Sequence, residues 1–253
     1  ISNYGMYDYF RDKFSEITTS SSQGTIVGGW DIYNKQYVLS LQADTGFYNT
    51  LTFDESVLGW TSFFSYKPNQ IFSIKSDYYT LNNGSLYKHY SNNTRGSFYG
   101  VTSKTSITFV FNPKISLSKV FQTINYEGSN GWQIDSFVSD STGFDLSLNN
   151  NWVEYNDTAN AVSSKPAIYS YDEGVYQENG VTYRIGFNRK ENKYNASIIN
   201  TSSARPEEVV FGGSMTGVKG YFTVVTASTD ATTNPGGLKE LFAVSSNYVE
   251  SSY

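Results

Sequence analysis

From Thr25 onward, apolar and polar residues alternate at a period of two, and no other feature of the sequence restricts its fold as strongly. Successive side chains of a strand point to opposite faces, so this period is typical of half-buried β-strands. The strongest hairpin signal is Asn82-Asn83-Gly84, because Asn and Gly tolerate the positive φ angles of tight turns. Short strands separated by such turns predict an all-β protein.

The composition supports the same fold class. The chain has 253 residues, among them 22 Tyr, 17 Phe and 21 Gly, and only 16% of its residues are charged. Aromatic residues fit a pleated, half-buried surface, whereas Gly and the abundant Asn and Ser supply turns. The length is enough to bury the core of one large β domain or of two smaller ones.

One segment departs from the alternation. Gly5–Ile17 carries apolar residues at three- and four-residue spacing, which predicts a short N-terminal helix, and a flexible break follows at Ser20–Gly24. The polar, Asn-rich stretch Ser91–Gly96 is the best candidate for a domain boundary. We therefore expect a helical connector over residues 1–24, propeller-like antiparallel β hairpins over residues 25–95 and a β-sandwich-like module over residues 96–253.

Three further segments give specific expectations about the strands. The alternation predicts one strand over Ile71–Leu81, which enters the turn at Asn82, and one strand over Lys119–Tyr126. Gly128–Gly131 is interpreted as a hairpin loop because it is rich in turn residues.

Charge and residue content exclude several classes of protein. The formal net charge is −5, which disfavours nucleic-acid binding because that function needs clustered basic residues against phosphates. No run of about 18 apolar residues is present, so we expect no membrane-spanning helix. The lack of Cys excludes disulfides, thiolate metal sites and a Cys nucleophile. No secretory signal is recognisable, and because the sequence starts at Ile1 without Met, we expect it to be part of a longer protein.

The single His of the chain, His89, lies in the predicted strand Ser85–Tyr90. A catalytic His needs a positioned partner and a His metal site needs further ligands, and the sequence suggests neither nearby. We interpret His89 as a strand residue packed among tyrosines. We predict no catalytic residue, no metal site and no organic cofactor.

An acidic series could in principle serve a glycosidase, which needs two carboxylates on opposite sides of a sugar. The spacing of the series is irregular and does not match a calcium-binding loop. We interpret these residues as solvated loop residues. The series consists of Glu127, Asp135, Asp140 and Asp145.

Aromatic clusters within Gly59–Tyr66 and Asp77–Tyr79 are the most conspicuous feature. Alternation places Trp60 and Phe64 on one face of the first strand and Phe63 on the other. Large aromatic residues on both faces suit a strand that is buried between layers or in a subunit interface, whereas exposed rings would suit stacking on sugars. We predict the core or interface role. The candidate residues are Trp60, Phe63, Phe64, Tyr66, Tyr78 and Tyr79.

Several short phrases follow one another in a characteristic order over residues 59–100. They are Gly59-Trp60-Thr61-Ser62-Phe63-Phe64-Ser65-Tyr66-Lys67-Pro68, Tyr78-Tyr79-Thr80, Gly84-Ser85-Leu86-Tyr87-Lys88-His89 and Phe98-Tyr99-Gly100. Their order resembles the C-terminal part of large virion structural proteins of tailed bacteriophages, including those of cyanobacterial and crAss-like phages. The resemblance covers most of residues 5–253 and is best over residues 59–100.

The resemblance implies a non-enzymatic structural component of a virion, in the tail, nozzle or neck, that assembles symmetrically with copies of itself and with other virion proteins. Two alternatives stay open. The first is a receptor- or glycan-binding module of a phage tail, in which Trp60, Tyr78 and Tyr79 are exposed in a groove and a host-surface glycan is the partner. The second, less favoured, is a polysaccharide-degrading enzyme that uses two carboxylates about 5–9 Å apart.

Overall fold

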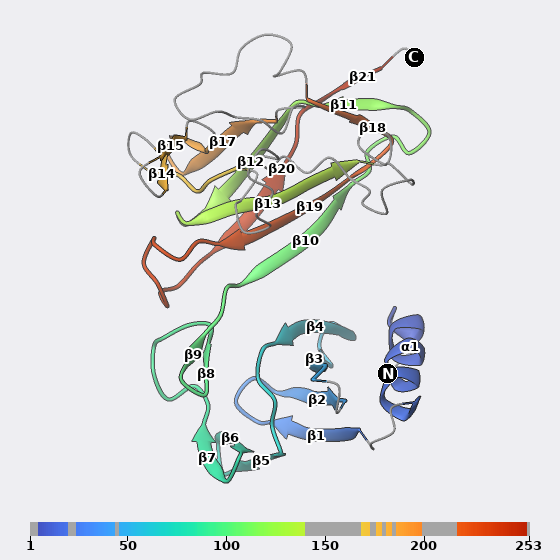
Figure 1. Cartoon of the computed structure of the whole chain (residues 1–253), viewed down its shortest axis with the longest axis vertical. Helices are drawn as coiled ribbons and strands as arrows, with labels where there is room; N and C mark the ends of the chain where they lie inside the picture. Colours follow the sequence, from blue (N-terminus) through green and yellow to red (C-terminus); the bar gives the residue numbers. More distant parts are fainter. Residues whose placement is uncertain are drawn as a thin grey trace. The chain divides into compact units, whose positions relative to one another are not determined.

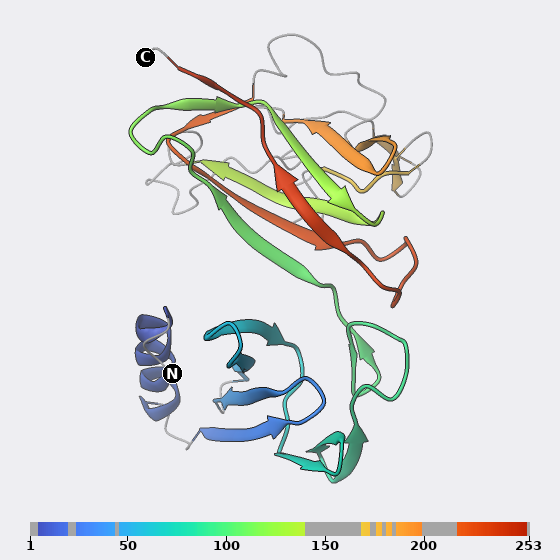
Figure 2. The same cartoon turned by 180° about the vertical axis from the view of Figure 1, so that it is seen from behind.

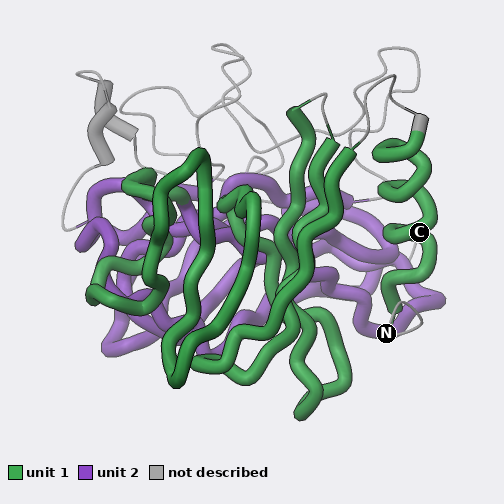
Figure 3. Tube along the Cα trace, turned by 90° about the horizontal axis from the view of Figure 1, so that it is seen from below, with its two compact units in different colours: residues 1–103 green, residues 104–253 purple. Residues whose placement is uncertain are grey.

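The computed structural model describes residues 5–19, 24–43, 46–139, 168–172, 176–178, 181–183, 186–198 and 217–251. The chain divides into two compact units, residues 1–103 and residues 104–253 (Figure 3). The described residues form antiparallel strands and one short helix near the N-terminus. The predicted fold class, all-β with a short N-terminal helix, is confirmed. The boundaries predicted at residues 24/25 and 95/96 stay a prediction.

The first unit contains helix α1 and a four-stranded antiparallel sheet, in which each strand pairs with the next in the chain (Figure 1). The strands are β1 (Thr25–Asp31), β2 (Gln36–Gln42), β3 (Tyr48–Asp54) and β4 (Gly59–Phe64). The connections from β1 to β2 and from β3 to β4 are each four residues long, which suits the pairing of strands that follow each other in the chain.

Helix α1 spans Tyr7–Thr19, two residues later at each end than predicted. Phe10 and Ile17 lie seven residues apart, about two helical turns, and therefore on one face. Both are buried and pack against Leu41 of β2 and Leu51 of β3. This contact forms a small hydrophobic core between α1 and the sheet.

A second, three-stranded antiparallel sheet of the first unit is formed by β5 (Gln70–Ile74), β6 (Asp77–Asn82) and β7 (Ser85–Lys88). The prediction of a single strand over Ile71–Leu81 is wrong, because the chain reverses at Lys75, whose φ is +57°. The predicted turn at Asn83-Gly84 is confirmed, with φ angles of +48° and +78°. A two-stranded ribbon follows, formed by β8 (Ser97–Phe98) and β9 (Val101–Thr102).

The close contact of β1 with β5 depends on Gly29. A Cβ atom at this position would lie 2.4 Å from Cγ2 of Ile71, so only Gly allows the two strands to approach this closely. The hydroxyl of Ser73 on β5 also donates a hydrogen bond of 2.6 Å to the carbonyl of Trp30 on β1. Packing and hydrogen bonding therefore both hold the two sheets of the first unit together.

The described strands of the second unit form two larger antiparallel sheets and two with shorter strands (Figure 2). One larger sheet has the order β10 (Ser106–Phe111), β19 (Thr223–Thr229), β13 (Trp132–Ser139). The other has the order β16 (Asn188–Lys190), β17 (Lys193–Ser197), β12 (Thr123–Gly128), β20 (Leu241–Ser245). The sheets with shorter strands are β18 (Val218–Gly220), β11 (Lys119–Phe121), β21 (Tyr248–Glu250), and β14 (Tyr176–Glu178), β15 (Val181–Tyr183).

Both larger sheets contribute to one hydrophobic core. Phe137 and Val225 come from one sheet, Ile124 and Tyr194 come from the other, and all four are almost fully buried. Tyr126 of β12 lies directly opposite Tyr194 of β17, and their rings stack with centroids 4.4 Å apart and planes 7° apart. The second unit is thus two sheets packed face to face around aromatic and aliphatic side chains.

Two predictions about this unit are wrong. Lys119–Tyr126 is not one strand, because the backbone N–H and carbonyl of Gln122 bond to Asn247 and Ile198, and β11 and β12 on either side join different sheets. Gly128–Gly131 is not a hairpin loop, because β12 and β13 do not pair with each other. The segment instead carries the chain from one larger sheet to the other.

Candidate functional site

The six predicted aromatic residues divide by burial. Tyr66 and Tyr78 are buried, with 3% and 0% of their surface exposed. Trp60, Phe64 and Tyr79 are half-buried, and Phe63 is 57% exposed. Because Tyr78 is fully buried, Trp60, Tyr78 and Tyr79 do not form the exposed sugar-binding surface that the first alternative requires.

Trp60 and Phe63 both contact α1, although alternation predicted that they lie on opposite faces of β4. The Trp60 ring lies 5.0 Å from that of Phe10, and the Phe63 ring lies 5.7 Å from that of Tyr9. The cause is a β-bulge in β4, where the pairing with β3 shifts register after Trp60. One extra residue inverts the alternation beyond it, so the predicted assignment of faces is wrong.

Tyr66, Tyr78 and His89 form a compact aromatic cluster in the first unit. The His89 ring lies 5.0 Å from that of Tyr66 and 4.8 Å from that of Tyr78, and the two tyrosine hydroxyls are 3.1 Å apart. Burial raises the pKa of both tyrosines well above the usual value, so both hydroxyls are neutral. The packing of His89 among tyrosines is confirmed, but β7 ends at Lys88, so His89 lies in the turn that follows and not in the predicted strand Ser85–Tyr90.

A chain of hydroxyl groups reaches His89. Nε2 of His89 lies 2.8 Å from Oγ1 of Thr80, and the same Oγ1 lies 2.8 Å from the hydroxyl of Tyr99. Burial lowers the pKa of His89 to about 4, against a weaker opposing effect of Asp31. His89 is therefore neutral at pH 7, and Nε2 can accept a hydrogen bond from Thr80 while Thr80 accepts one from Tyr99.

Asp31, at the end of β1, has a buried carboxylate that accepts several hydrogen bonds, and 1% of its surface is exposed. Its carboxylate accepts hydrogen bonds from the backbone N–H groups of Tyr33 and Asn34, at 2.9 and 3.2 Å, and from the Asn34 side chain at 3.2 Å. The hydroxyl of Tyr90 donates a further bond of 2.6 Å. Asp31 therefore holds the turn after β1 and connects it to the residue that follows His89.

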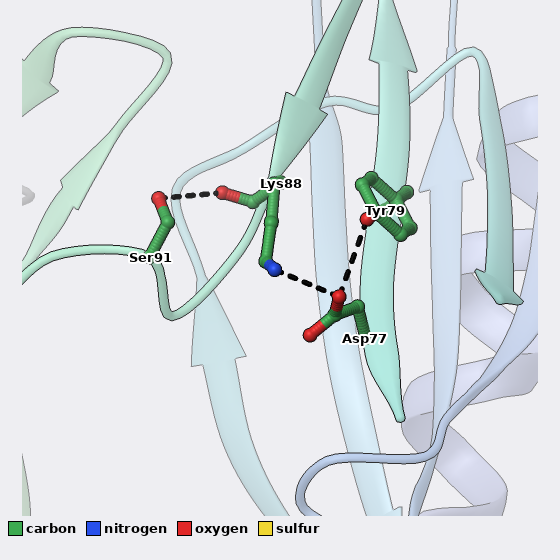
Figure 4. A network of polar contacts seen from close by, with 4 residues as sticks. All are labelled: Asp77, Tyr79, Lys88 and Ser91. Carbon is green, nitrogen blue, oxygen red and sulfur yellow. Dashed lines mark hydrogen bonds and ion pairs between the residues drawn. The ribbon is translucent and has the colours of Figure 1, made fainter. Parts of the chain in front are cut away.

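A second polar network lies at the surface of β6 and β7 (Figure 4). Nζ of Lys88 lies 2.7 Å from Oδ2 of Asp77, and the hydroxyl of Tyr79 donates to the same oxygen at 3.4 Å. The hydrogen bond from Lys88 lowers the pKa of Asp77. The hydroxyl of Ser91 donates to the carbonyl of Lys88. These contacts fix the end of β7 where the chain turns toward β8.

The acidic series is not brought together where the structure describes it. Glu127 on β12 forms a 2.8 Å ion pair with Lys193, whereas Asp135 on β13, in the other large sheet, accepts a hydrogen bond from Gln133. Asp140 and Asp145 lie outside the described residues. Within the described part of the chain, no group of three or more His, Cys, Asp or Glu is placed to bind a metal ion. In that same part, no helix has the length and apolar character needed to cross a membrane.

Sequence reasoning missed two further features. The first is the edge of β10, which has no partner strand among the described residues and where Val110 is 56% exposed. The uncharged run Ser106–Phe111 is the sequence signal for this edge. The second is a pocket of about 420 Å³ in the first unit, lined by aromatic residues that include Tyr87 and Tyr99 and by Arg95. No periodic pattern in the sequence marks that pocket, because its residues come from three strands and from the loops before and after β8.

Two comparisons with known proteins each match part of the chain. Residues 93–201 match the family described as the Crassvirus muzzle protein C-terminal domain, a range that contains β8 to β17. The chain is also 28% identical over 106 residues to the muzzle protein of Bacteroides phage crAss001. This match covers 42% of the chain but only 7% of that protein. The predicted resemblance to virion proteins of crAss-like phages is thus confirmed over this part of the chain.

Proposed function

We propose that the chain is a non-enzymatic building block of the tail, nozzle or neck of the virion, and that it assembles symmetrically with copies of itself and with other virion proteins. The similarity to a muzzle protein supports a role in a permanent assembly. Such a role needs rigid β modules and extended contact surfaces.

The observation that carries the proposal is the free edge of β10. Among the described strands, β10 pairs with β19 alone and is the outermost strand of its sheet. Its sequence, Ser106–Phe111, contains no charged residue and no Pro, the residues that usually protect an edge from pairing with another chain. We infer that this edge is covered in the virion by a neighbouring copy of the chain, through backbone hydrogen bonds and contacts of Val110.

The surroundings of the candidate catalytic groups support a non-enzymatic role. The His89 ring is enclosed by aromatic rings and held by Thr80, and Glu127 is paired with Lys193. In this role, Tyr66 and Tyr78 serve the core of the first unit, and the exposed ring of Phe63 is available for an interface.

The test compares two substitutions of exposed valines by Lys. Val110→Lys places a charge on the free edge, whereas Val101→Lys places one on β9, where Val101 is 65% exposed. Both variants should melt like the wild-type protein. Val110→Lys should fail to enter particles and Val101→Lys should enter them, as measured by mass spectrometry of purified virions.

Normal incorporation of Val110→Lys would contradict the role of the β10 edge. Electron microscopy of the native particle tests the rest of the proposal. The expected result is repeated copies of the chain around a symmetry axis in the tail, nozzle or neck. A single unpaired copy, or a location elsewhere in the particle, would contradict it.

A further inference from the structure

The pocket of the first unit combines aromatic walls with a free cation. It has a volume of about 420 Å³, within the range of small-molecule sites, and its lining comes from β4, β7, β8 and the loops before and after β8. Tyr87 and Tyr99 form one wall, with ring centroids 4.4 Å apart and planes inclined by 45°. Because the two rings contact each other, they offer one continuous aromatic surface and no slot for a flat ring between them.

The polar groups of the pocket are hydrogen-bonding side chains and one arginine side chain, Arg95, that forms no ion pair among the described residues. Asn92, Thr94 and Arg95 line the pocket and are exposed to solvent. Among the described residues that line the pocket there is no Asp or Glu, and Lys88 is already paired with Asp77. Among the described residues, Arg95 forms no ion pair and no side-chain hydrogen bond. The one cation of the pocket without a protein partner is therefore a guanidinium group.

The backbone of the pocket is held in a conformation that bulky residues rarely adopt. Tyr90 and Tyr99 both line the pocket, and their φ angles are +57° and +54°. Such φ angles cost free energy for a residue with a large side chain and persist only when the surroundings impose them. The hydrogen bond between Tyr99 and Thr80 holds one ring of the wall, and Tyr87 packs against that ring, while the hydrogen bond from Tyr90 to Asp31 holds the chain beside the wall. The aromatic wall is thus preformed.

We propose that this pocket binds an acidic sugar, whose pyranose ring lies on the wall formed by Tyr87 and Tyr99 and whose carboxylate is bound by Arg95. The electron-rich faces of aromatic rings attract the slightly positive C–H groups of a pyranose face. Asn92 and Thr94 supply hydrogen bonds for hydroxyl groups, and a guanidinium group recognises a carboxylate with two parallel hydrogen bonds. This site is independent of the proposed assembly through β10.

A second pocket has a different lining chemistry. It also has a volume of about 420 Å³, but it lies in the second unit and is lined by Glu127, Glu191 and Glu240 together with Lys193. Three carboxylates would repel an acidic sugar, and of the residues named in its lining only Phe242 is aromatic. An acidic sugar should therefore bind at the pocket around Arg95 and not at this one.

The experiment uses the full chain with two probes, galacturonate and galactose, in saturation-transfer NMR and in titrations. We expect galacturonate to bind with a Kd on the order of 1 mM and galactose to bind at least about tenfold more weakly. Arg95→Gln should weaken galacturonate binding roughly tenfold, whereas the control Lys104→Gln, another exposed cation, should not change it.

Variants of the aromatic wall complete the test. Tyr87→Ala should abolish binding and Tyr87→Phe should retain it, while Tyr7→Ala, which removes an exposed ring on α1, should have no effect. A melting curve for each variant separates loss of the wall from loss of folding. The proposal is overturned if galacturonate does not bind, if galactose binds equally well, or if folded Arg95→Gln and Tyr87→Ala bind like the wild-type protein.

Discussion

The ring of Phe10 on α1 and the indole of Trp60 on β4 have centroids 5.0 Å apart. Trp60 also contacts Phe53 of β3 edge to face, at 5.4 Å. One side chain thus joins the helix to two strands of the sheet. The indole N–H is buried and has no hydrogen-bond partner among the described residues, so the contribution of Trp60 is apolar packing.

The change in the free energy of unfolding on replacement of Trp60 should therefore depend on loss of the ring and not on loss of the N–H group. Trp60→Ala should lower the free energy of unfolding by roughly 2–4 kcal/mol, since it removes the contacts with Phe10 and Phe53 and leaves a cavity. Trp60→Phe should cost less than about 1.5 kcal/mol, because it keeps an aromatic ring and removes an unpaired donor. Chemical denaturation of the full chain measures both. Equal stabilities of Trp60→Ala and the wild-type protein would contradict a structural role.

Gly29→Ala should destabilise the first unit. The added methyl group would lie 2.4 Å from Cγ2 of Ile71, so β1 and β5 would have to separate, at a cost of about 1–3 kcal/mol. Gly59→Ala is the matched control, because its nearest neighbour would be the carbonyl oxygen of Val57 at 3.7 Å, an ordinary contact. Thermal melting should separate the two variants by several degrees. Identical melting curves would show that β1 and β5 do not pack this closely in solution.

The sequence predicted the elements whose signals are local. Asn83-Gly84 forms the expected turn because Asn and Gly adopt positive φ at low cost. Lys75 adopts positive φ as well, but Lys has no preference for it, so the turn between β5 and β6 left no signal. The β-bulge beside Trp60 was hidden for a similar reason, since the extra residue is defined by the pairing with β3.

The pairing of strands that are distant in the sequence could not be predicted from local sequence patterns either. β13 and β19 are neighbours in one sheet although about 90 residues separate them, and β12 and β13 belong to different sheets although only three residues lie between them. The choice of partner is decided by the shared core around Phe137 and Val225, not by the loop. The pocket around Arg95 depends on three strands and could not be read from any one segment.

Removal of divalent metal ions should leave the stability of the chain unchanged. The chain has no Cys and a single His, and that His is hydrogen-bonded within the aromatic cluster. We expect the melting temperature in excess EDTA to agree with that in buffer within experimental error. A decrease of several degrees, restored by added Ca²⁺ or Zn²⁺, would show that a metal ion contributes to folding.

Tyr126 and Tyr194 should be energetically coupled, because they face each other across β12 and β17 with their rings stacked. A double-mutant cycle with Tyr126→Leu and Tyr194→Leu should give a coupling energy of about 0.5–1.5 kcal/mol beyond the apolar area lost. The control cycle pairs Tyr126→Leu with Tyr221→Leu, an exposed residue, and should give a coupling near zero. Additive effects in the first cycle would mean that the stacking contributes nothing.

The single His should make the stability of the chain depend on pH between about 6.5 and 4. Burial lowers the pKa of His89 to about 4 in the folded state, whereas in the unfolded chain it is near 6.5. Between these values the unfolded state binds one more proton than the folded state. Stability is therefore greatest above pH 6.5 and falls as the pH decreases to 4. The full shift corresponds to roughly 3 kcal/mol, and partial exposure of the ring reduces this to on the order of 2 kcal/mol.

His89→Gln is the control for this pH dependence, since a glutamine can still accept the hydrogen bond from Thr80 but does not titrate. The carboxylates titrate in both proteins and cancel in the difference between them. The free energy of unfolding of the wild-type protein should therefore fall more steeply than that of the variant from pH 6.5 to 4. The two curves should run parallel above pH 7, where His89 is neutral in both states. Parallel curves over the whole range would show that His89 takes up its proton without leaving the aromatic cluster, and that burial does not lower its pKa.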